Sequence, residues 1–154
     1  MELWQDSGAE PSRDSCSRVW KGSAPDVAEV NLDDAVSQKE AISLIGMIPW
    51  ILVRCSDWTM IPLENLISYS SGSGTKIVAA ISDIVELNGA AFALEHGVDA
   101  LLLPPRNVDL WEEAEIIFSN KNSVNKANET VVRLSPAKIS SINSSGIGER
   151  GCID

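Results

Sequence analysis

The segment that follows the apolar run 50–55 carries the side chains best suited to proton transfer. Asp57 comes two residues after the end of this run, and Glu64 and Asn65 lie within the short helical pattern that follows. A carboxylate held at a fixed distance can accept a proton from a substrate or hold a substrate ammonium group. The same residue types are also ordinary near a helix start, where Asp caps backbone amides and Glu interacts favourably with the dipole. Spacing alone leaves a catalytic and a structural role open for both carboxylates.

Arg106 is the candidate for binding a negatively charged substrate group. It follows two prolines at the end of the apolar run 98–103. A guanidinium matches the geometry of a carboxylate, so Arg106 could clamp a substrate acid. An arginine in a solvated loop is the alternative.

Several other kinds of site lack the residues that they need. No lysine ends a predicted strand, which argues against Schiff-base chemistry. The chain has a single histidine and no clustered ligands, so a metal site is not supported. The Gly146-Ile147-Gly148 turn lacks the third glycine and the following helix of a dinucleotide fingerprint. It is interpreted as a turn between strands.

Short apolar runs recur about every 25 residues, which is the length of a strand-helix unit. These runs are 27–32, 50–55, 76–81 and 98–103. Parallel strands bring the loops after their carboxyl ends to one edge of the sheet, where reactive groups gather. The predicted fold class is therefore α/β, with repeated βα units forming a partial, half-barrel-like parallel sheet.

Helices are predicted between these runs from their start signals. Three pairs have the spacing of a capping box: Ser37 with Glu40, Asp83 with Glu86, and Asp109 with Glu112. A further helix over 61–69 carries an apolar stripe that should face the sheet. His96 and Gly97 are expected to close the third helix.

The composition divides the chain into three parts. Residues 1–26 are predicted to be an irregular lead-in, and 27–120 to be the βα-repeat domain. Residues 121–154 change to Asn, Ser and Lys and then to short β-like runs, so they are expected to start a truncated β-rich domain.

Charge and cysteine content limit the partners and the compartment. The formal net charge of -10 argues against nucleic acid, whose binding depends on lysine and arginine. Cys16, Cys55 and Cys152 are odd in number and widely spaced, which favours a reducing compartment over a disulfide framework. No apolar run is long enough for a membrane span and no signal peptide is evident. We therefore expect a soluble intracellular protein with a small-molecule substrate.

Several stretches resemble one enzyme family. The residues that carry the resemblance are the Asp57-Trp58 pair, IPLENLI at 61–67, TKIVAAI at 75–81, LEHGVDALLL at 94–103 and GIGERGCID at 146–154. In this order and spacing they resemble 3-dehydroquinate synthase of the second, NAD-linked type. No match is evident before about residue 27, where the family's own first units are expected to be absent or replaced.

The resemblance implies a reaction, a cofactor and site residues. Hydride transfer to NAD would oxidise the amine of an amino-keto sugar acid to an imine, and water would hydrolyse the imine and release ammonia. The product would then close by intramolecular aldol attack to 3-dehydroquinate, in aromatic amino-acid biosynthesis by the shikimate route. Asp57 and Glu64 would then be catalytic, and Asn65 and Arg106 would bind substrate; no residue is assigned to NAD. The family's distribution implies the cytoplasm, or a plastid if the chain comes from a plant.

The last residues depart from the family's pattern. Glu149 replaces an aspartate and Gly151 replaces a β-branched residue, which weakens a strand. The family's carboxyl domain would begin where this chain stops, so the catalytic unit is expected to be incomplete. The alternative is a truncated, non-catalytic remnant or an interaction module, associating with itself or a full-length homologue through its open sheet edges. A phosphate-binding barrel is disfavoured because no glycine-rich loop opens a helix.

Overall fold

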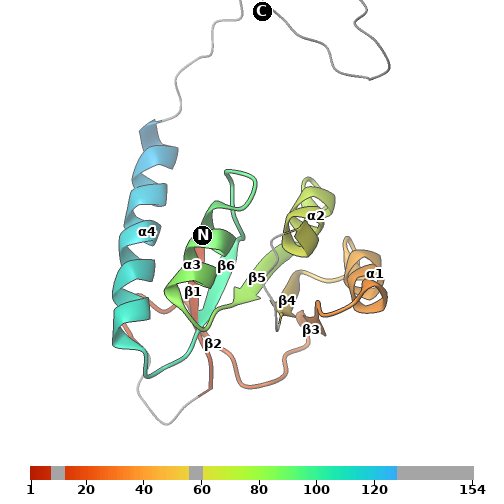
Figure 1. Cartoon of the computed structure of the whole chain (residues 1–154), viewed down its shortest axis with the longest axis horizontal. Helices are drawn as coiled ribbons and strands as arrows, with labels where there is room; N and C mark the ends of the chain where they lie inside the picture. Colours follow the sequence, from red (N-terminus) through yellow and green to blue (C-terminus); the bar gives the residue numbers. More distant parts are fainter. Residues whose placement is uncertain (8–12, 56–60, 128–154) are drawn as a thin grey trace, which may run out of the picture.

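The computed structural model describes residues 1–7, 13–55 and 61–127, and within them it forms one parallel sheet with helices packed against it (Figure 1). The strands are β1 Glu2–Gln5, β2 Arg18–Val19, β3 Val27–Asn31, β4 Trp50–Arg54, β5 Lys76–Ala80 and β6 Ala100–Leu103. The helices are α1 Ala35–Leu44, α2 Ile61–Ser70, α3 Ile84–Phe92 and α4 Val108–Ala127. The predicted α/β half-barrel is confirmed, and each of the four predicted strands is present.

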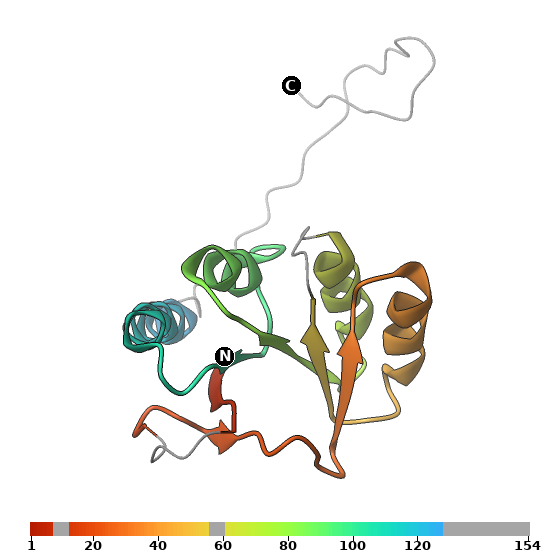
Figure 2. The same cartoon turned by 60° about the horizontal axis from the view of Figure 1, so that its bottom comes forward.

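The sheet has the strand order β2-β1-β6-β5-β4-β3, with every pairing parallel. Strands β1 and β4 are separated by β6 and β5, which in a flat sheet would place them about 14 Å apart. The ring centroids of Trp4 on β1 and Trp50 on β4 nevertheless lie 4.8 Å apart. The sheet is therefore strongly curled, with its concave face turned inward (Figure 2).

The two faces of the sheet bury different sets of side chains, because successive residues of a strand point to opposite faces. On the convex face, strand residues such as Ile51, Ile77 and Leu101 pack with helix residues such as Leu66 and Leu87. The concave face packs strand and loop residues alone: Trp4, Trp20, Val27, Leu52, Val78, Ala100 and Leu102. The helices thus cover one face and leave the other as the inside of the half-barrel.

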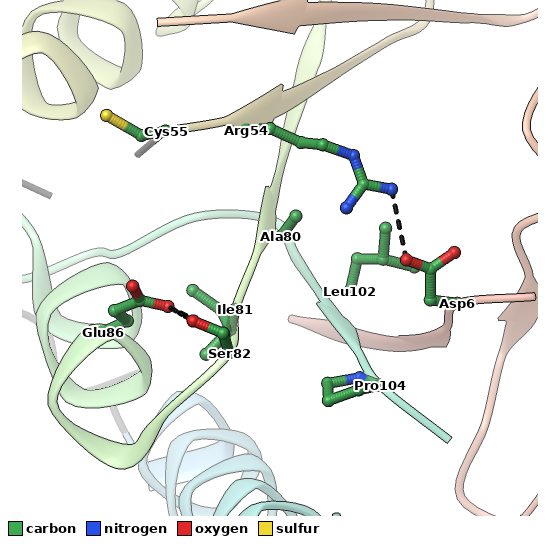
Figure 3. Close-up of a pocket in the computed structure, with 9 residues that line it drawn as sticks. All are labelled: Asp6, Arg54, Cys55, Ala80, Ile81, Ser82, Glu86, Leu102 and Pro104. Atoms are coloured by element: carbon green, nitrogen blue, oxygen red, sulfur yellow. Dashed lines mark hydrogen bonds and ion pairs between the residues drawn. The ribbon is translucent and has the colours of Figure 1, made fainter. Parts of the chain in front are cut away.

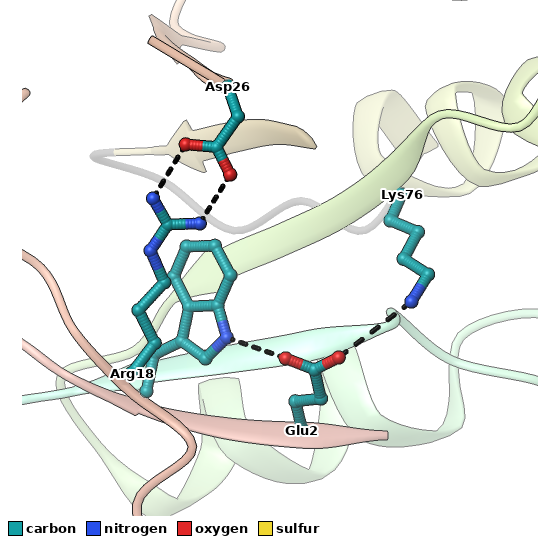
Figure 4. Close-up of polar contacts among 5 residues, drawn as sticks. Glu2, Arg18, Asp26 and Lys76 are labelled. Carbon is teal, nitrogen blue, oxygen red and sulfur yellow. Dashed lines mark hydrogen bonds and ion pairs between the residues drawn. The ribbon is translucent and has the colours of Figure 1, made fainter. Parts of the chain in front are cut away.

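Polar contacts cross the amino-terminal end of the concave face (Figure 4). Arg18 on β2 donates from both terminal nitrogens to Asp26, just before β3, at 2.7 Å each. Lys76 on β5 lies 3.7 Å from the Glu2 carboxylate on β1, and Glu2 also accepts from the Trp4 indole at 3.1 Å. The Arg18–Asp26 pair therefore connects the two edge strands, and the Lys76–Glu2 pair connects strands that are not neighbours.

The Arg18–Asp26 pair predicts a change of stability in acid. The hydrogen bond from Arg18 lowers the pKa of Asp26. The carboxylate therefore stabilises the fold above its unfolded pKa of about 3.9, and the contribution is lost as pH falls through the lower folded value. Between about pH 6 and about pH 2.5, the free energy of unfolding should fall more in the unaltered chain than in Asp26→Asn.

Urea unfolding at both pH values measures this difference. Arg18→Met supplies the matched control, because it removes the partner and leaves the carboxylate; its pH profile should resemble that of Asp26→Asn. The contribution is small, since 28% and 40% of the two side chains remain exposed. Parallel profiles for all three proteins would contradict the assignment.

The expected irregular lead-in over residues 1–26 is wrong. Strand β1 lies inside the sheet between β2 and β6, and its Leu3 and Trp4 are fully buried. Four residues of β1 and two of β2 are too few to show a period in the sequence. The predicted boundary at residue 121 lies inside α4, which continues to Ala127. The remainder of the proposed β-rich domain lies outside the described residues, and the division into domains stays a prediction.

The predicted helix caps are confirmed in one case and corrected in two. Asp83 caps α3, accepting from the Glu86 amide at 2.9 Å. In α1 the cap is Asp34, three residues before the predicted Ser37, and Ser37 occupies the third helical position. In α4, Asn107 rather than Asp109 accepts from the Leu110 amide. The corrected caps come three residues earlier in α1 and two residues earlier in α4, because both helices begin before the predicted positions.

Candidate active site

A pocket of about 270 Å³ opens at the carboxyl edge of the sheet (Figure 3). Its walls are the ends of β4, β5 and β6, the residue after β1, and the first turn of α3. The concave face provides its floor through Ala80 and Leu102. In parallel α/β folds this edge collects functional groups, because the loops and helix amino termini converge there.

Arg54, the last residue of β4, forms one wall of the pocket. Its Nε donates to Glu29 on the neighbouring strand β3 at 2.5 Å, and its Nη2 lies 3.2 Å from the Asp6 carboxylate. Asp6 is held in turn, because its amide donates to the Leu103 carbonyl and its other oxygen accepts from the Ser7 amide. The guanidinium is thus fixed between carboxylates from two non-adjacent strands.

The remaining terminal nitrogen of Arg54 points away from Asp6 (Figure 3). Within the described part of the chain, Nη1 has no hydrogen-bond partner. Burial lowers the pKa of Arg54, but the hydrogen bonds and charges of Glu29 and Asp6 outweigh this and raise it above its ordinary value. Arg54 therefore keeps its positive charge at the pocket, and no acceptor among the described residues uses its Nη1.

A carboxylate and a hydroxyl face Arg54 from the other side of the pocket (Figure 3). Glu86, in the first turn of α3, accepts from both the amide and the hydroxyl of Ser82 at 2.7 Å each. Asp83 caps the same helix and keeps this turn in place. The pocket thus has a cation on one wall and an anion on the other. It suits a small molecule that carries both a negative and a positive group.

The predicted site residues are not gathered in this pocket. Asp57 lies outside the described residues. Glu64 is half-buried and Asn65 exposed on α2, and Arg106 is exposed in the β6–α4 loop; none of these three lines the pocket. Their catalytic and binding roles stay predictions.

Sequence reasoning missed Arg54, Asp6 and Glu86 as pocket residues. Asp6 fell in the presumed lead-in, and Glu86 was assigned only a capping role. Arg54 carried a usable signal, since a charged residue ends the buried run Ile51–Val53 at the carboxyl edge of the sheet.

Three helix amino termini in the described residues are poorly suited to a dinucleotide. A pyrophosphate binds free amides at a helix amino terminus, but in α1, α3 and α4 the side chains of Asp34, Asp83 and Asn107 occupy such amides. The pocket volume of about 270 Å³ also lies below the usual range for larger ligands. We assign no NAD contact to these residues.

A metal centre and a membrane-spanning helix are two further features to consider. In residues 1–7, 13–55 and 61–127, no group of three or more His, Cys, Asp or Glu side chains is arranged to hold a metal ion. Across the same ranges, no helix has the length and apolar character required to cross a membrane.

Comparison with protein families gives one match, to the 3-dehydroquinate synthase II N-terminal domain over residues 8–118. This range begins well before residue 27, so the expected absence of family character in the first residues is wrong. It includes all of the pocket residues except Asp6.

Archaeal relatives support the same assignment. A 3-dehydroquinate synthase of Methanocaldococcus jannaschii is 34% identical over 114 residues, which is 73% of this chain and 30% of the relative. One from Methanocella arvoryzae is 35% identical over 127 residues, covering 82% of this chain and 32% of the relative. The chain thus spans about a third of the length of these relatives, and no solved structure matches it. The chain belongs to the 3-dehydroquinate synthase II family.

Proposed function

We propose that this chain provides the substrate-binding pocket of a 3-dehydroquinate synthase of the second type. The reaction would be the NAD-dependent oxidative deamination and cyclisation of 2-amino-3,7-dideoxy-D-threo-hept-6-ulosonate to 3-dehydroquinate, in aromatic amino-acid biosynthesis. The family and the names of the archaeal relatives support the activity. The observation that carries the proposal is Arg54, which faces Glu86 across a pocket at the carboxyl edge.

The two charged walls match the two charged groups of such a substrate. Nη1 of Arg54 would bind the substrate carboxylate, while Glu29 and Asp6 hold the guanidinium in place. Glu86 would hold the substrate ammonium group and is positioned to accept its proton. Asp57 and Glu64 remain candidates for further proton transfers, because they follow β4, whose end forms a wall of the pocket. Only membership of the family supports the proposed dependence on NAD.

A second candidate is a non-catalytic interaction module derived from the same enzyme. One observation favours it: within the described residues β2 and β3 are the edge strands of an open sheet, and unpaired strand edges recruit partners. This candidate predicts association with itself or with a full-length homologue and no substrate binding.

Thermal unfolding of the full chain with added ligands distinguishes the two candidates. A ligand that binds only the folded state raises the midpoint, so the amino-keto acid should raise it if the pocket binds substrate. The same sugar acid without its amine is the matched control and should give a smaller shift. NAD reduction and 3-dehydroquinate formation are then followed in the same samples. A raised midpoint without NAD reduction would show that the chain binds the substrate but does not convert it. An unchanged midpoint with both acids would contradict the proposed pocket.

A further inference from the structure

The floor of the pocket between Arg54 and Glu86 is apolar. Strand β5 lies between β4 and β6, and its last residue, Ala80, pairs with Leu102 on β6 (Figure 3). Leu102 is 1% exposed and Ala80 is half-buried, so the methyl group of Ala80 is the more accessible part of this floor. The backbone amide after Ala80 donates to the Leu102 carbonyl at 2.9 Å and is not free to bind a ligand. The floor thus offers a ligand two apolar side chains.

The polar side chains of the pocket stand on its walls and bond to one another. Asp6 binds Arg54 and the Ser7 amide, and Ser82 binds Glu86. A hydroxyl group placed on the floor would lose its hydrogen bonds to water and gain none from the floor residues, which weakens binding. A methylene group has no hydrogen bonds to lose and is stabilised by leaving water. The pocket therefore combines charged walls with a floor that favours carbon without oxygen.

The substrate in the proposed function has this combination of groups. It is an amino acid at one end, with a carboxylate on carbon 1 and an amine on carbon 2. It is also a deoxy sugar acid, because carbon 3 is a methylene group where an ordinary sugar acid has a hydroxyl. When the carboxylate binds Arg54 and the ammonium group binds Glu86, carbon 3 is attached to a carbon held between the two walls. The floor is the surface below that position.

We propose that Ala80 and Leu102 determine specificity, by selecting the acid with a methylene group at carbon 3 over the same acid with a hydroxyl there. An apolar surface rejects an added hydroxyl by about 100-fold at most, so the expected preference is about 10- to 100-fold. This inference rests on the proposed function for the identity and placement of the ligand. It goes beyond it in naming the residues that recognise the missing hydroxyl.

Calorimetric titration of the full chain measures the preference. The amino-keto acid should bind about 10- to 100-fold more tightly than its 3-hydroxy derivative. The 3-methyl derivative is the matched ligand, because it adds a group of similar size that forms no hydrogen bonds. It should bind more tightly than the 3-hydroxy derivative. Equal affinities for these two derivatives would show that the floor limits size alone, which would overturn the inference.

Ala80→Ser tests the floor directly. The added hydroxyl can hydrogen-bond the 3-hydroxy derivative, so the preference for the amino-keto acid should fall by about threefold or more. Ala24→Ser is the matched control, because Ala24 is also half-buried against the concave-face cluster but does not line the pocket. It should keep the preference of the unaltered chain within about twofold. Thermal unfolding shows whether both variants are folded.

The outcomes separate this inference from the proposed function. A preference that Ala80→Ser reduces and Ala24→Ser leaves unchanged supports the role of the floor. Equal affinities of the unaltered chain for the amino-keto acid and its 3-hydroxy derivative would overturn that role and leave the proposed function standing. Equal effects of the two serine variants would do the same. If the unaltered chain binds none of the three acids, the proposed function fails and the inference fails with it.

Discussion

Arg54→Met is expected to weaken binding of the amino-keto acid by about 10- to 100-fold, the effect of losing a hydrogen bond between two charged groups. Glu29 and Asp6 fix the side chain, so Nη1, which no described residue binds, is held in place before a ligand arrives. Methionine keeps much of the aliphatic stem and removes the charge. Calorimetric titration of the full chain with the substrate measures the change.

Two further variants isolate the role of the guanidinium. Lys39→Met removes one exposed positive charge on α1 and should leave affinity unchanged, which controls for net charge. Arg54→Lys keeps the charge but cannot bond two carboxylates and a ligand in one plane, so it should recover little of the affinity. Unfolding is measured for each variant, since losing Arg54 leaves Asp6 and Glu29 unpaired. Unchanged affinity for the substrate in a folded Arg54→Met protein would show that Arg54 does not bind it.

Gly97→Ala is expected to lower the free energy of unfolding by about 2–5 kcal/mol, combining left-handed backbone strain with overpacking. Gly97 has a φ of +70°, and an added Cβ would lie 1.9 Å from the Ala91 carbonyl oxygen. That oxygen belongs to the end of α3, where Lys121 of α4 also donates to it. Burial at this junction lowers the pKa of Lys121. Urea denaturation measures the loss.

Gly72→Ala provides the control for Gly97. Its φ of +75° is similar, but an added Cβ would meet nothing within 4 Å. Only the backbone strain then applies, so the expected loss is about 1–2 kcal/mol. Equal losses in the two variants would show that the contact with Ala91 does not matter.

Strands β4, β5 and β6 were predictable because each contains a buried run of apolar residues, whereas β3 alternates between buried and more exposed positions. Central parallel strands are covered on both faces, so their sequences are almost continuously apolar, as in Ile51–Val53 and Ala100–Leu103. Strand β1 is equally buried but ends in Gln5 and begins with Glu2, so its four residues resemble a polar loop. Its place in the sheet is determined by pairing with β6, and no local sequence pattern predicts this pairing.

The candidate site was less predictable than the fold. Spacing drew attention to residues that follow strands, and Glu86 was identified as part of a helix start. The contact between Asp6 and Arg54 joins strands that are not neighbours, so it depends on how strongly the sheet curls. Curvature results from packing across the concave face, including the close approach of Trp4 and Trp50. No linear motif encodes such a contact.

The position of β1 has a consequence for the order of folding during synthesis. Glu2 pairs with Ala100, so β1 can pair early with β2 but not with its other neighbour, β6, until β6 has been made. Strands β3, β4 and β5 pair with the next strand along and can assemble earlier. Contacts between residues far apart in the sequence are slow to form, and Trp4 stays unburied in the meantime. The growing chain therefore exposes the apolar side chains of β1, Leu3 and Trp4, until β6 is available to pair with them.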